Sequence, residues 1–350
     1  MRKVKLLFLL LIVAAIYNCS EEKKTFFIGN VKVISFEKQR SVSGEHLNID
    51  SIGVNGVDVL DKYLIVSLYG DPYLTQIYDL KTLDLIGKFL LKGQGPNDFG
   101  YISIIKTAYP YFWVQDRVYE NIRLINVEEI IADKQSTAKK VLHYDNIVEP
   151  FNAFYVNDTC LLIKSFDVNK GLYYFYYNPG NGVRSHEVTM YNYPVTSDIL
   201  YSKMIPLADG MKPDGNKIIS ISGVLDQIDI LDMHHPEKSI SVTTTNSQYD
   251  YEYIKNTHSE EMKTFYFSYP YCSDRLIFAL YENNDTKDLN NIELHIIDWE
   301  GNPIYKLLLE QKIEIFSIDL NNGFMYGINK VEERLYRYDI KDILESYEKS

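Results

Sequence analysis

The sequence predicts an all-β fold, a six-bladed β-propeller of four-stranded blades whose ring is closed by an N-terminal strand. Long helical periodicity is nearly absent, whereas short runs rich in Val, Ile, Tyr and Phe recur between turn signals. A unit of strand, polar turn, strand, loop, strand ending in Asp or Asn, turn and outer strand recurs six times along the chain. The 30 tyrosines fit this fold, since aromatic side chains suit a pleated, half-buried surface.

Residues 1–18 are predicted to be an export signal that is not part of the fold. Three basic residues precede an apolar run, Leu6 to Ile16, which is too short to span a bilayer core of ~30 Å as a helix. Tyr17-Asn18-Cys19 follows this run, and a polar string comes directly after Cys19. This arrangement resembles a bacterial lipobox, in which the cysteine is lipidated and becomes the first residue of the mature chain.

We therefore expect a lipid anchor at Cys19, a tether over residues 19–25 and a propeller domain over residues 26–350. The expected partner at the anchor is the membrane, and the expected location is the outer membrane, on its periplasmic or exposed side. Tyr17 and Asn18 depart from the small residues usual before a lipidated cysteine, so a plain signal peptide or a misassigned start remains the alternative.

The charge of the chain excludes one class of function. The net charge is −12, and removal of a signal that carries Arg2, Lys3 and Lys5 takes it to −15. A nucleic-acid-binding protein needs a basic face, so nucleic acid is not an expected partner. An acidic domain would also not lie flat on an anionic membrane, and a tether would hold it clear of the surface.

The blades follow one another along the chain. The clearest unit comprises Val57 to Ser67, Thr75 to Leu80 and Leu85 to Leu90. The residue that ends the third strand of each unit serves as a landmark, and the six landmarks are Asp79, Asn126, Asn178, Asp232, Asp298 and Asp339. They are separated by 47, 52, 54, 66 and 41 residues, which is typical of propeller blades. A two-domain sandwich would not explain this recurring unit.

The last unit lacks an outer strand. It ends at Asp339 and is followed only by a short helix-like tail, Lys341 to Glu348. We expect the stretch Phe26 to Phe36 to supply the missing strand, because an N-terminal strand on the last blade closes the ring and leaves no open edge.

One interblade loop suggests a family. The loop Gly93 to Phe99 directly follows an outer strand, and its Gly-x-Gly-Pro core resembles the loop that links blades in the six-bladed TolB-like β-propeller lipoproteins of Bacteroidota. The resemblance implies an exported lipoprotein propeller, and it implies no particular activity. Pro96 and Asp98 break the glycine pattern of nucleotide-binding loops, and no helix follows to hold a phosphate.

The loops at one end of the propeller are the expected binding surface. The segments Tyr69 to Tyr73, Gly93 to Asp98 and Ser165 to Lys170 are predicted to gather around the central channel, where tyrosines stack on sugars or peptides. The candidate ligand-binding residues are Tyr69, Asp71, Tyr73, Gln94, Asn97 and Asp98. The alternatives are that the glycine loop is only an interblade turn, and that most tyrosines pack between blades.

The sequence offers no catalytic motif, cofactor motif or metal-ligand spacing. His234 and His235 stand in a turn where adjacent side chains diverge, and Lys287 interrupts a faint calcium-loop pattern. Cys160 and Cys272 are expected to be two separate buried thiols, with a disulfide as the alternative.

Two function classes follow from these observations. The first is a noncatalytic binding or assembly protein at the cell envelope, with a glycan, a peptide or an envelope protein as its partner. The second is a hydrolase or lactonase sited in the channel, since the fold by itself does not choose between them. An aromatic channel mouth would favour binding, and a channel lined by three or more metal-binding oxygens would favour the enzyme.

Overall fold

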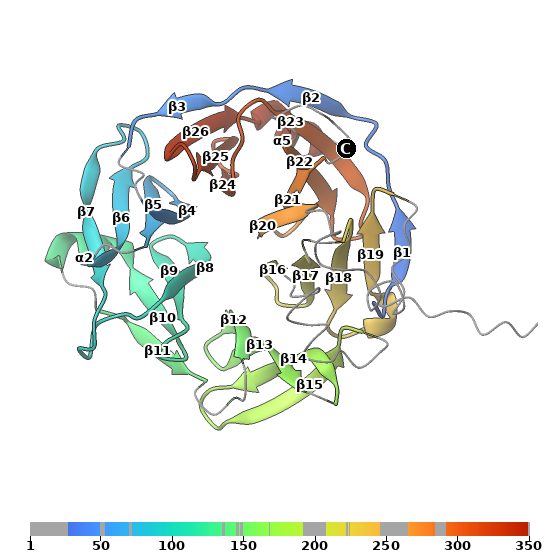
Figure 1. Ribbon diagram of the computed structural model, residues 1–350. Coiled ribbons are helices and arrows are strands. Elements are labelled where there is room, and N and C mark those ends of the chain that lie inside the picture. The colour runs from blue at the N-terminus through green and yellow to red at the C-terminus, as the bar shows by residue number, and fades with distance from the viewer. Residues whose placement is uncertain are drawn as a thin grey trace, which may run out of the picture.

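The computed structural model is a ring of six β-sheets around a central axis (Figure 1), which confirms the predicted fold class. It describes residues 27–49, 53–69, 72–134, 137–144, 147, 150–167, 169–191, 208–221, 223, 225–245, 265–283 and 292–348. The predicted signal, the tether and Cys19 lie outside these residues.

The four strands of each blade pair antiparallel, and the innermost strand comes first in the sequence. Blade 1 contains β4 (Val54–Leu60), β5 (Tyr63–Leu68), β6 (Tyr73–Asp79) and β7 (Leu85–Leu91). Blade 2 contains β8 (Ile102–Ala108), β9 (Tyr111–Asp116), β10 (Asn121–Asn126) and β11 (Lys140–His143). Blade 3 contains β12 (Pro150–Asn157), β13 (Cys160–Asp167), β14 (Gly171–Asn178) and β15 (Val183–Thr189).

The remaining blades repeat this order. Blade 4 contains β16 (Ala208–Met211), β17 (Lys217–Ile221), β18 (Ile228–Asp232) and β19 (Ile240–Thr243). Blade 5 contains β20 (Tyr266–Cys272), β21 (Leu276–Glu282), β22 (Ile292–Asp298) and β23 (Pro303–Leu309). Blade 6 contains β24 (Ile315–Asp319), β25 (Phe324–Asn329) and β26 (Arg334–Asp339), and its outer strand comes from the N-terminal segment.

The landmark residue has the same structural role in every blade. In each case its side-chain oxygen accepts a hydrogen bond from a backbone N–H two to four residues later, at the turn that follows the third strand. Asp and Asn favour such turns because their short side chains replace a backbone acceptor. In blade 2 the landmark Asn126 caps helix α2 (Val127–Asp133) by accepting from the N–H groups of Glu128 and Glu129. The sequence pattern did not predict this helix.

The N-terminal segment closes the ring, but with a different strand from the one expected. Strand β3 (Glu45–Leu47), and not the stretch Phe26 to Phe36, pairs antiparallel with β26 of blade 6. Strand β1 (Asn30–Val33) instead adds a fifth, parallel strand to blade 4, and β2 (Gln39–Val42) adds one to blade 5. The chain thus runs around the outside of three blades (Figure 1) before it closes the ring, so the closing strand lies later in the sequence.

Side-chain contacts hold this outer segment in place. Arg40 donates two hydrogen bonds to Asp342 of the C-terminal helix α5 (Lys341–Glu348), at 2.6 and 2.8 Å. Between β2 and β3 the chain crosses so close to the ring of Tyr338 that a Cβ atom on Gly44 would lie 2.7 Å from it. Glycine is required here for the close approach of the backbone.

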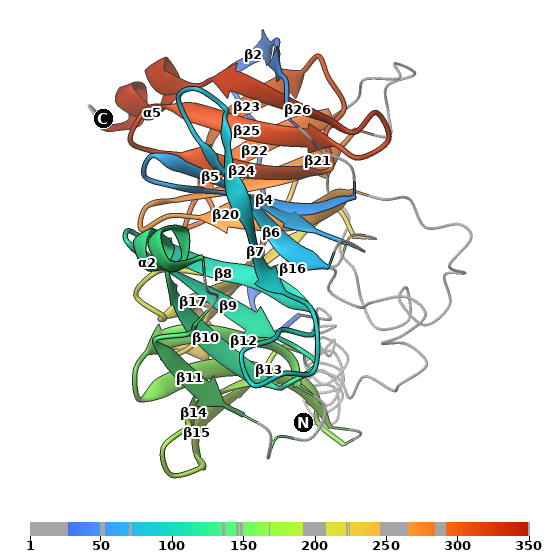
Figure 2. The ribbon, with the colours of Figure 1, turned by 90° about the vertical axis from the view of Figure 1, so that its left-hand side faces the viewer.

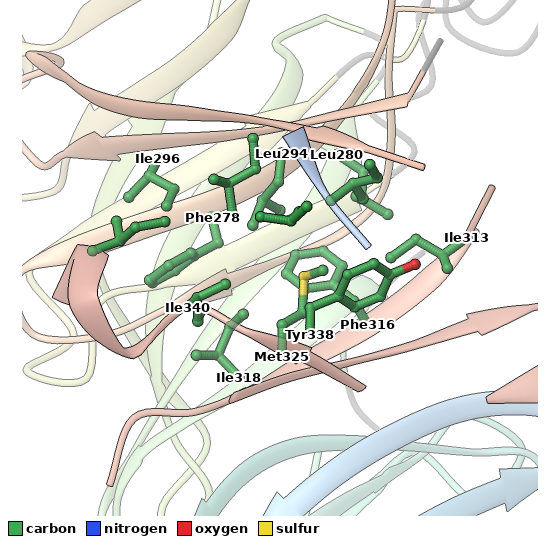
Figure 3. Close-up of a cluster of buried hydrophobic side chains, with 14 of the residues drawn as sticks. Phe278, Leu280, Leu294, Ile296, Ile313, Phe316, Ile318, Met325, Tyr338 and Ile340 are labelled. Atoms are coloured by element: carbon green, nitrogen blue, oxygen red, sulfur yellow. The ribbon is translucent and has the colours of Figure 1, made fainter. Parts of the chain in front are cut away.

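Apolar side chains fill the spaces between neighbouring blades. In Figure 3, side chains of β21 and β22 pack against side chains of blade 6; the labelled members are Phe278, Leu280, Leu294, Ile296, Ile313, Phe316, Ile318, Met325, Tyr338 and Ile340. Many tyrosines are also buried, as expected if tyrosines pack between blades. The buried ones include Tyr63, Tyr78, Tyr144, Tyr174, Tyr266, Tyr326 and Tyr338.

The innermost strands differ in their exposure to solvent. Strands in the middle of a blade, such as β5, are fully buried, whereas β4, β8, β12 and β20 are partly exposed over much of their length. The other two innermost strands, β16 and β24, are largely buried. The six innermost strands surround the axis of the ring, as expected for a propeller (Figure 1).

Helices α2 and α5 lie at one end of the ring (Figure 2). The predicted helical tail over Lys341–Glu348 is confirmed as α5. Within the described part of the chain, no helix has the length and apolar character needed to cross a membrane. Cys160 and Cys272 are both free thiols, so the disulfide alternative is wrong, although both are only partly buried.

Candidate binding site at the mouth of the channel

The predicted ligand-binding loops lie at the same end of the ring. We call this end, where each innermost strand begins, the upper face, and the opposite end, where α2 and α5 lie, the lower face. In an antiparallel blade the turn between the second and third strands also lies at the upper face. The loops after β5, β7 and β13, which contain the candidate residues, therefore all lie there.

Three tyrosines and one arginine form a cluster at the mouth of the channel. The hydroxyls of Tyr69 and Tyr101 lie 3.0 Å apart, and their rings stack with centroids 6.0 Å apart. The guanidinium of Arg117 lies 5.9 Å from the centre of the Tyr101 ring and donates a hydrogen bond of 3.2 Å to the hydroxyl of Tyr269. We call Tyr69, Tyr101, Arg117 and Tyr269 the mouth cluster.

The mouth cluster spans the ring. Arg117 follows the second strand of blade 2, whereas Tyr269 lies on β20, the innermost strand of blade 5. Blades 2 and 5 occupy opposite positions in a six-membered ring, so the hydrogen bond between these residues crosses the axis. A register shift in β20 between Phe267 and Tyr271, with Ser268 at a positive φ of 73°, accompanies the placement of Tyr269. Bulges of this kind reorient side chains, often near functional sites.

The mouth cluster presents both apolar faces and hydrogen-bonding groups to solvent. Tyr69 is 51% exposed and Tyr269 is 50% exposed, unlike the tyrosines buried between blades. Desolvation of the hydroxyl, together with the hydrogen bond to Tyr101, raises the pKa of Tyr69 to about 12. The phenol therefore stays protonated at physiological pH and both donates and accepts hydrogen bonds. A stacking face with such an edge is the chemistry that binds sugar rings and peptide groups.

The loop from Gly93 to Asp98 is joined to this site. The hydroxyl of Tyr119, two residues after Arg117, donates to the carbonyl of Gly93 at 2.6 Å. The N–H of Lys92 donates to the carbonyl of Pro72, in the loop that contains Tyr69, at 2.7 Å. The two sequence-predicted loops are thus held together as one surface.

Within this loop the candidate residues differ in their contacts. The carboxylate of Asp98 accepts a hydrogen bond of 2.7 Å from the N–H of Gly95, and a Cβ on Gly93 would lie 2.2 Å from it. Asp98 therefore stabilises the turn, which agrees with the alternative that this loop is an interblade turn. Gln94 and Asn97 are exposed, and their role as ligand-binding residues stays a prediction.

The other candidates are placed as follows. Tyr73 is 39% exposed at the start of β6, and Asp71 lies outside the described residues. Ser165 is fully buried, and Lys170 forms a 2.6 Å ion pair with Glu187 on the outer strand of blade 3. The two ends of the third predicted loop, Ser165 and Lys170, therefore belong to the packing and ion pairs of blade 3.

One carboxyl on an inner strand has unusual electrostatics. Asp58 on β4 keeps partial contact with solvent, but the surrounding strands desolvate it and raise its pKa to about 8. No hydrogen-bond partner for this carboxyl is found among the described residues. Strongly shifted pKa values are frequent at functional sites, which makes Asp58 a residue to test.

The described residues contain no group of three or more His, Cys, Asp or Glu side chains arranged to hold a metal ion. His234 and His235 are exposed in a turn, as predicted, and the ring of His234 contacts Asn216 at 3.0 Å. The segment of the faint calcium-loop pattern, from residue 284 on, lies outside the described residues.

Sequence reasoning found Tyr69 but missed its three partners. Tyr101 directly precedes β8, and Arg117 directly follows β9, so both lie at the upper face. An alignment of the loops of the six blades would have placed both residues there. Tyr269 lies within a strand, and its exposure depends on the bulge, so no local pattern identifies it.

The architecture defines the class of protein, a six-bladed β-propeller, and known structures share it. No protein-family model matches the chain, and no curated protein matches it. A solved member of the DUF4221 family from Bacteroides vulgatus is similar over 91% of this chain and 98% of its own, with 9% identity and a TM-score of 0.56. A Bacteroides fragilis protein that is predicted to be exported is similar over 90% and 99%, with 13% identity and a TM-score of 0.51. At these identities the likeness shows the fold alone.

Proposed function

We propose that this protein is an exported, lipid-anchored propeller that binds a glycan, a peptide or an envelope protein at its upper face without catalysis. The mouth cluster is the observation that carries the proposal. It combines exposed aromatic faces, phenolic hydroxyls and one guanidinium at the upper face of the ring. Concave sites with aromatic walls and a few oriented polar groups are typical of ligand binding.

The sequence supports export and anchoring, and one structural neighbour supports export. The lipobox-like segment at Cys19 follows a basic and apolar leader, and the interblade loop resembles that of TolB-like propeller lipoproteins. A structural neighbour from Bacteroides fragilis is itself predicted to be exported. A lipid tether would hold the acidic domain clear of an anionic membrane and leave its upper face free to bind.

The proposal is tested by replacing the exposed rings. The mature chain is screened against neutral and acidic oligosaccharides and peptides, and Tyr69→Ala and Tyr269→Ala are then measured with the best binder. Each replacement is expected to weaken binding by about 1–2 kcal/mol, or roughly five- to thirtyfold, as at interface hot spots. Tyr109→Ala is the control, since Tyr109 is 47% exposed at the lower face. Equal affinity in all three variants would exclude the mouth cluster as the site.

A channel-sited hydrolase or lactonase is the second candidate, and Asp58 is the observation that favours it. A carboxyl with a pKa near 8 is protonated at neutral pH and is able to act as a general acid. If the protein turns over lactones or glycosides, Asp58→Asn should abolish turnover without changing the melting temperature. Turnover lost in this way would refute the noncatalytic proposal, whereas saturable binding without turnover would support it.

A further inference from the structure

A pocket on the lower face combines an apolar wall with an exposed cation. It has a volume of about 200 Å³ and lies where blades 5 and 6 meet helix α5; its lining includes Asp274, Arg275, Leu276, Leu320, Leu344 and Tyr347. This volume is below the roughly 300–1,000 Å³ of pockets that bury drug-sized ligands. The pocket is remote from the mouth cluster, which lies at the opposite end of the ring.

The cation of this pocket, Arg275, packs against an aromatic ring. The guanidinium of Arg275 lies 4.6 Å from the centre of the Tyr347 ring, a cation–π contact. Among the residues that the structure describes, no carboxylate or other acceptor is within hydrogen-bonding distance of this guanidinium. Its planar set of N–H donors, which matches a carboxylate in geometry, is therefore available to a ligand.

The turn that carries Arg275 is rigid. The Oγ of Ser273 accepts from the N–H groups of Arg275 and Leu276, at 3.3 and 2.8 Å, and donates to the carbonyl of Leu276 at 3.1 Å. The indole N–H of Trp299 donates to the carbonyl of Ser273 at 2.9 Å. A ligand would therefore meet a preorganised turn, which lowers the entropic cost of binding.

The opposite wall is apolar and equally fixed. Leu320 is 41% exposed although it lies in a tight turn whose backbone N–H groups bind Asp319 at 3.1 Å. Leu344 projects from α5, which is anchored by the buried Ile343 and by the Arg40–Asp342 ion pair. An exposed leucine that lines the same pocket as an exposed arginine fits a ligand that carries an apolar group next to an anionic one.

The neighbouring acid, Asp274, forms no ion pair with Arg275 within the described part of the chain. Burial lowers the pKa of Lys106 on β8, and the negative charge of Asp274 opposes this effect. Asp274 and Arg275 thus have different surroundings, the first near Lys106 and the second over Tyr347.

From these contacts we infer that the lower-face pocket binds a small apolar carboxylate, with the carboxylate on Arg275 and the apolar group against Leu320 and Leu344. Two sources supply such a group, a free acid and the C-terminal residue of a peptide. Both present the same chemistry to the pocket, and the inference is independent of the function proposed for the mouth cluster.

The test uses N-acetyl-L-leucine as the probe and its neutral amide as the matched control ligand, titrated into the full mature chain and followed by NMR or calorimetry. We expect saturable binding of the acid with a dissociation constant of roughly millimolar size, and binding of the amide at least about tenfold weaker. Arg275→Gln should weaken binding of the acid by a similar factor, and Leu320→Ser should weaken acid and amide alike. Tyr69→Ala, at the opposite face, should change neither.

The control variant is Arg184→Gln. Arg184 is also exposed and lies 4.9 Å from the ring of Phe175, but on the outer strand of blade 3. Equal binding of acid and amide, an unchanged affinity in Arg275→Gln, or no saturation up to about 20 mM acid would overturn the inference. A peptide ending in leucine that binds more tightly than the acid identifies a peptide terminus as the source, and a weaker one identifies a free acid.

Discussion

Single buried charges between blades 3 and 4 show how individual residues set the stability of this ring. The ammonium of Lys164 on β13 is 2% exposed and lies 2.8 and 3.1 Å from the two carboxylate oxygens of Asp209 on β16. The hydroxyls of Tyr174 and Ser220 also donate to Asp209, at 3.0 and 2.8 Å. A buried ion pair persists when its remaining lone pairs are hydrogen-bonded in this way.

Removing one member of this pair should be costly. We expect Lys164→Met to lower the free energy of unfolding by about 3–5 kcal/mol at neutral pH, because it leaves Asp209 as an uncompensated buried charge. Urea denaturation measures the loss. The exposed pair of Lys170 with Glu187 provides the control, and Lys170→Met should cost less than about 1 kcal/mol. The double variant Lys164→Met with Asp209→Asn should recover part of the loss, and no recovery would contradict the explanation.

A second buried carboxyl should make stability depend on pH. Burial raises the pKa of Asp229 to about 7, although Ser241 and Gln227 donate to it at 2.5 and 2.8 Å. The folded state thus holds this proton to a higher pH than the unfolded state, whose aspartate pKa is about 3.9. The stabilising contribution of the protonated Asp229 carboxyl is complete below about pH 4 and is lost as the pH rises towards 7.

Asp229→Asn keeps the shape of the protonated acid and removes its titration. We expect the variant to match the wild type near pH 4 and to exceed it near pH 7 or 8, by up to about 4 kcal/mol. Urea midpoints measured across this range give the difference between the two proteins, so other titrating groups cancel. Parallel pH profiles would show that Asp229 is ionised in the folded protein.

At the scale of elements, the strand that closes the ring is the shortest of the N-terminal strands. β3 contains three residues, Glu45–Leu47, and its pairing with β26 is reinforced by a 2.6 Å hydrogen bond from Arg337 to Glu45. Strands β1 and β2 cover the outer edges of blades that are already complete. Closure and edge protection are therefore separate functions of neighbouring segments.

Two truncations distinguish these functions. A chain that begins at residue 38 loses β1 and the buried Phe27 but keeps β3, so it should melt at a lower temperature and remain monomeric. A chain that begins at residue 49 also loses β3, which exposes the edge of β26, and it should aggregate. Size-exclusion chromatography and thermal melting provide the comparison. Two chains with the same oligomeric state would show that β3 is not needed for closure.

At the scale of the whole molecule, the propeller has two faces with different chemistry. Helices α2 and α5 lie at the lower face (Figure 2). The lower face also carries the apolar pocket, and the upper face carries the mouth cluster. Phe27, near the N-terminal end of the described chain, is buried among side chains of blades 3 and 4.

The proposed anchor is tested in cells of the source organism or a related host. We expect Cys19→Ala to move the protein from the membrane fraction to the soluble fraction, because a lipidated cysteine is the attachment point. Fractionation followed by immunoblotting measures the change, and Cys160→Ala is the control. A membrane fraction that is unchanged in Cys19→Ala would reject lipidation at this position.

Local patterns were enough to predict the number of blades and most of their strands. Each blade repeats an apolar strand pattern and a landmark Asp or Asn, and that landmark binds the turn directly after it, as Asp79 does with the N–H of Lys81 at 2.9 Å. Helix α2 was not predicted because its residues 127–133 form only a short insertion between strands, where Asn126 caps a helix in place of a turn. The sequence analysis named Tyr69 and its loop as candidates, but it did not name Tyr101, Arg117 or Tyr269.

The sequence by itself therefore determined the fold class, the acidic surface and the loops that reach the upper face, because each of these properties is carried by contiguous residues. Only the tertiary structure decided which N-terminal strand closes the ring, how Tyr269 meets Arg117 across the axis, and where Arg275 lies relative to α5. The residues of the cross-axis contact are 152 positions apart and come from opposite blades. Such contacts depend on ring closure and on strand register, neither of which has a signature within a single blade.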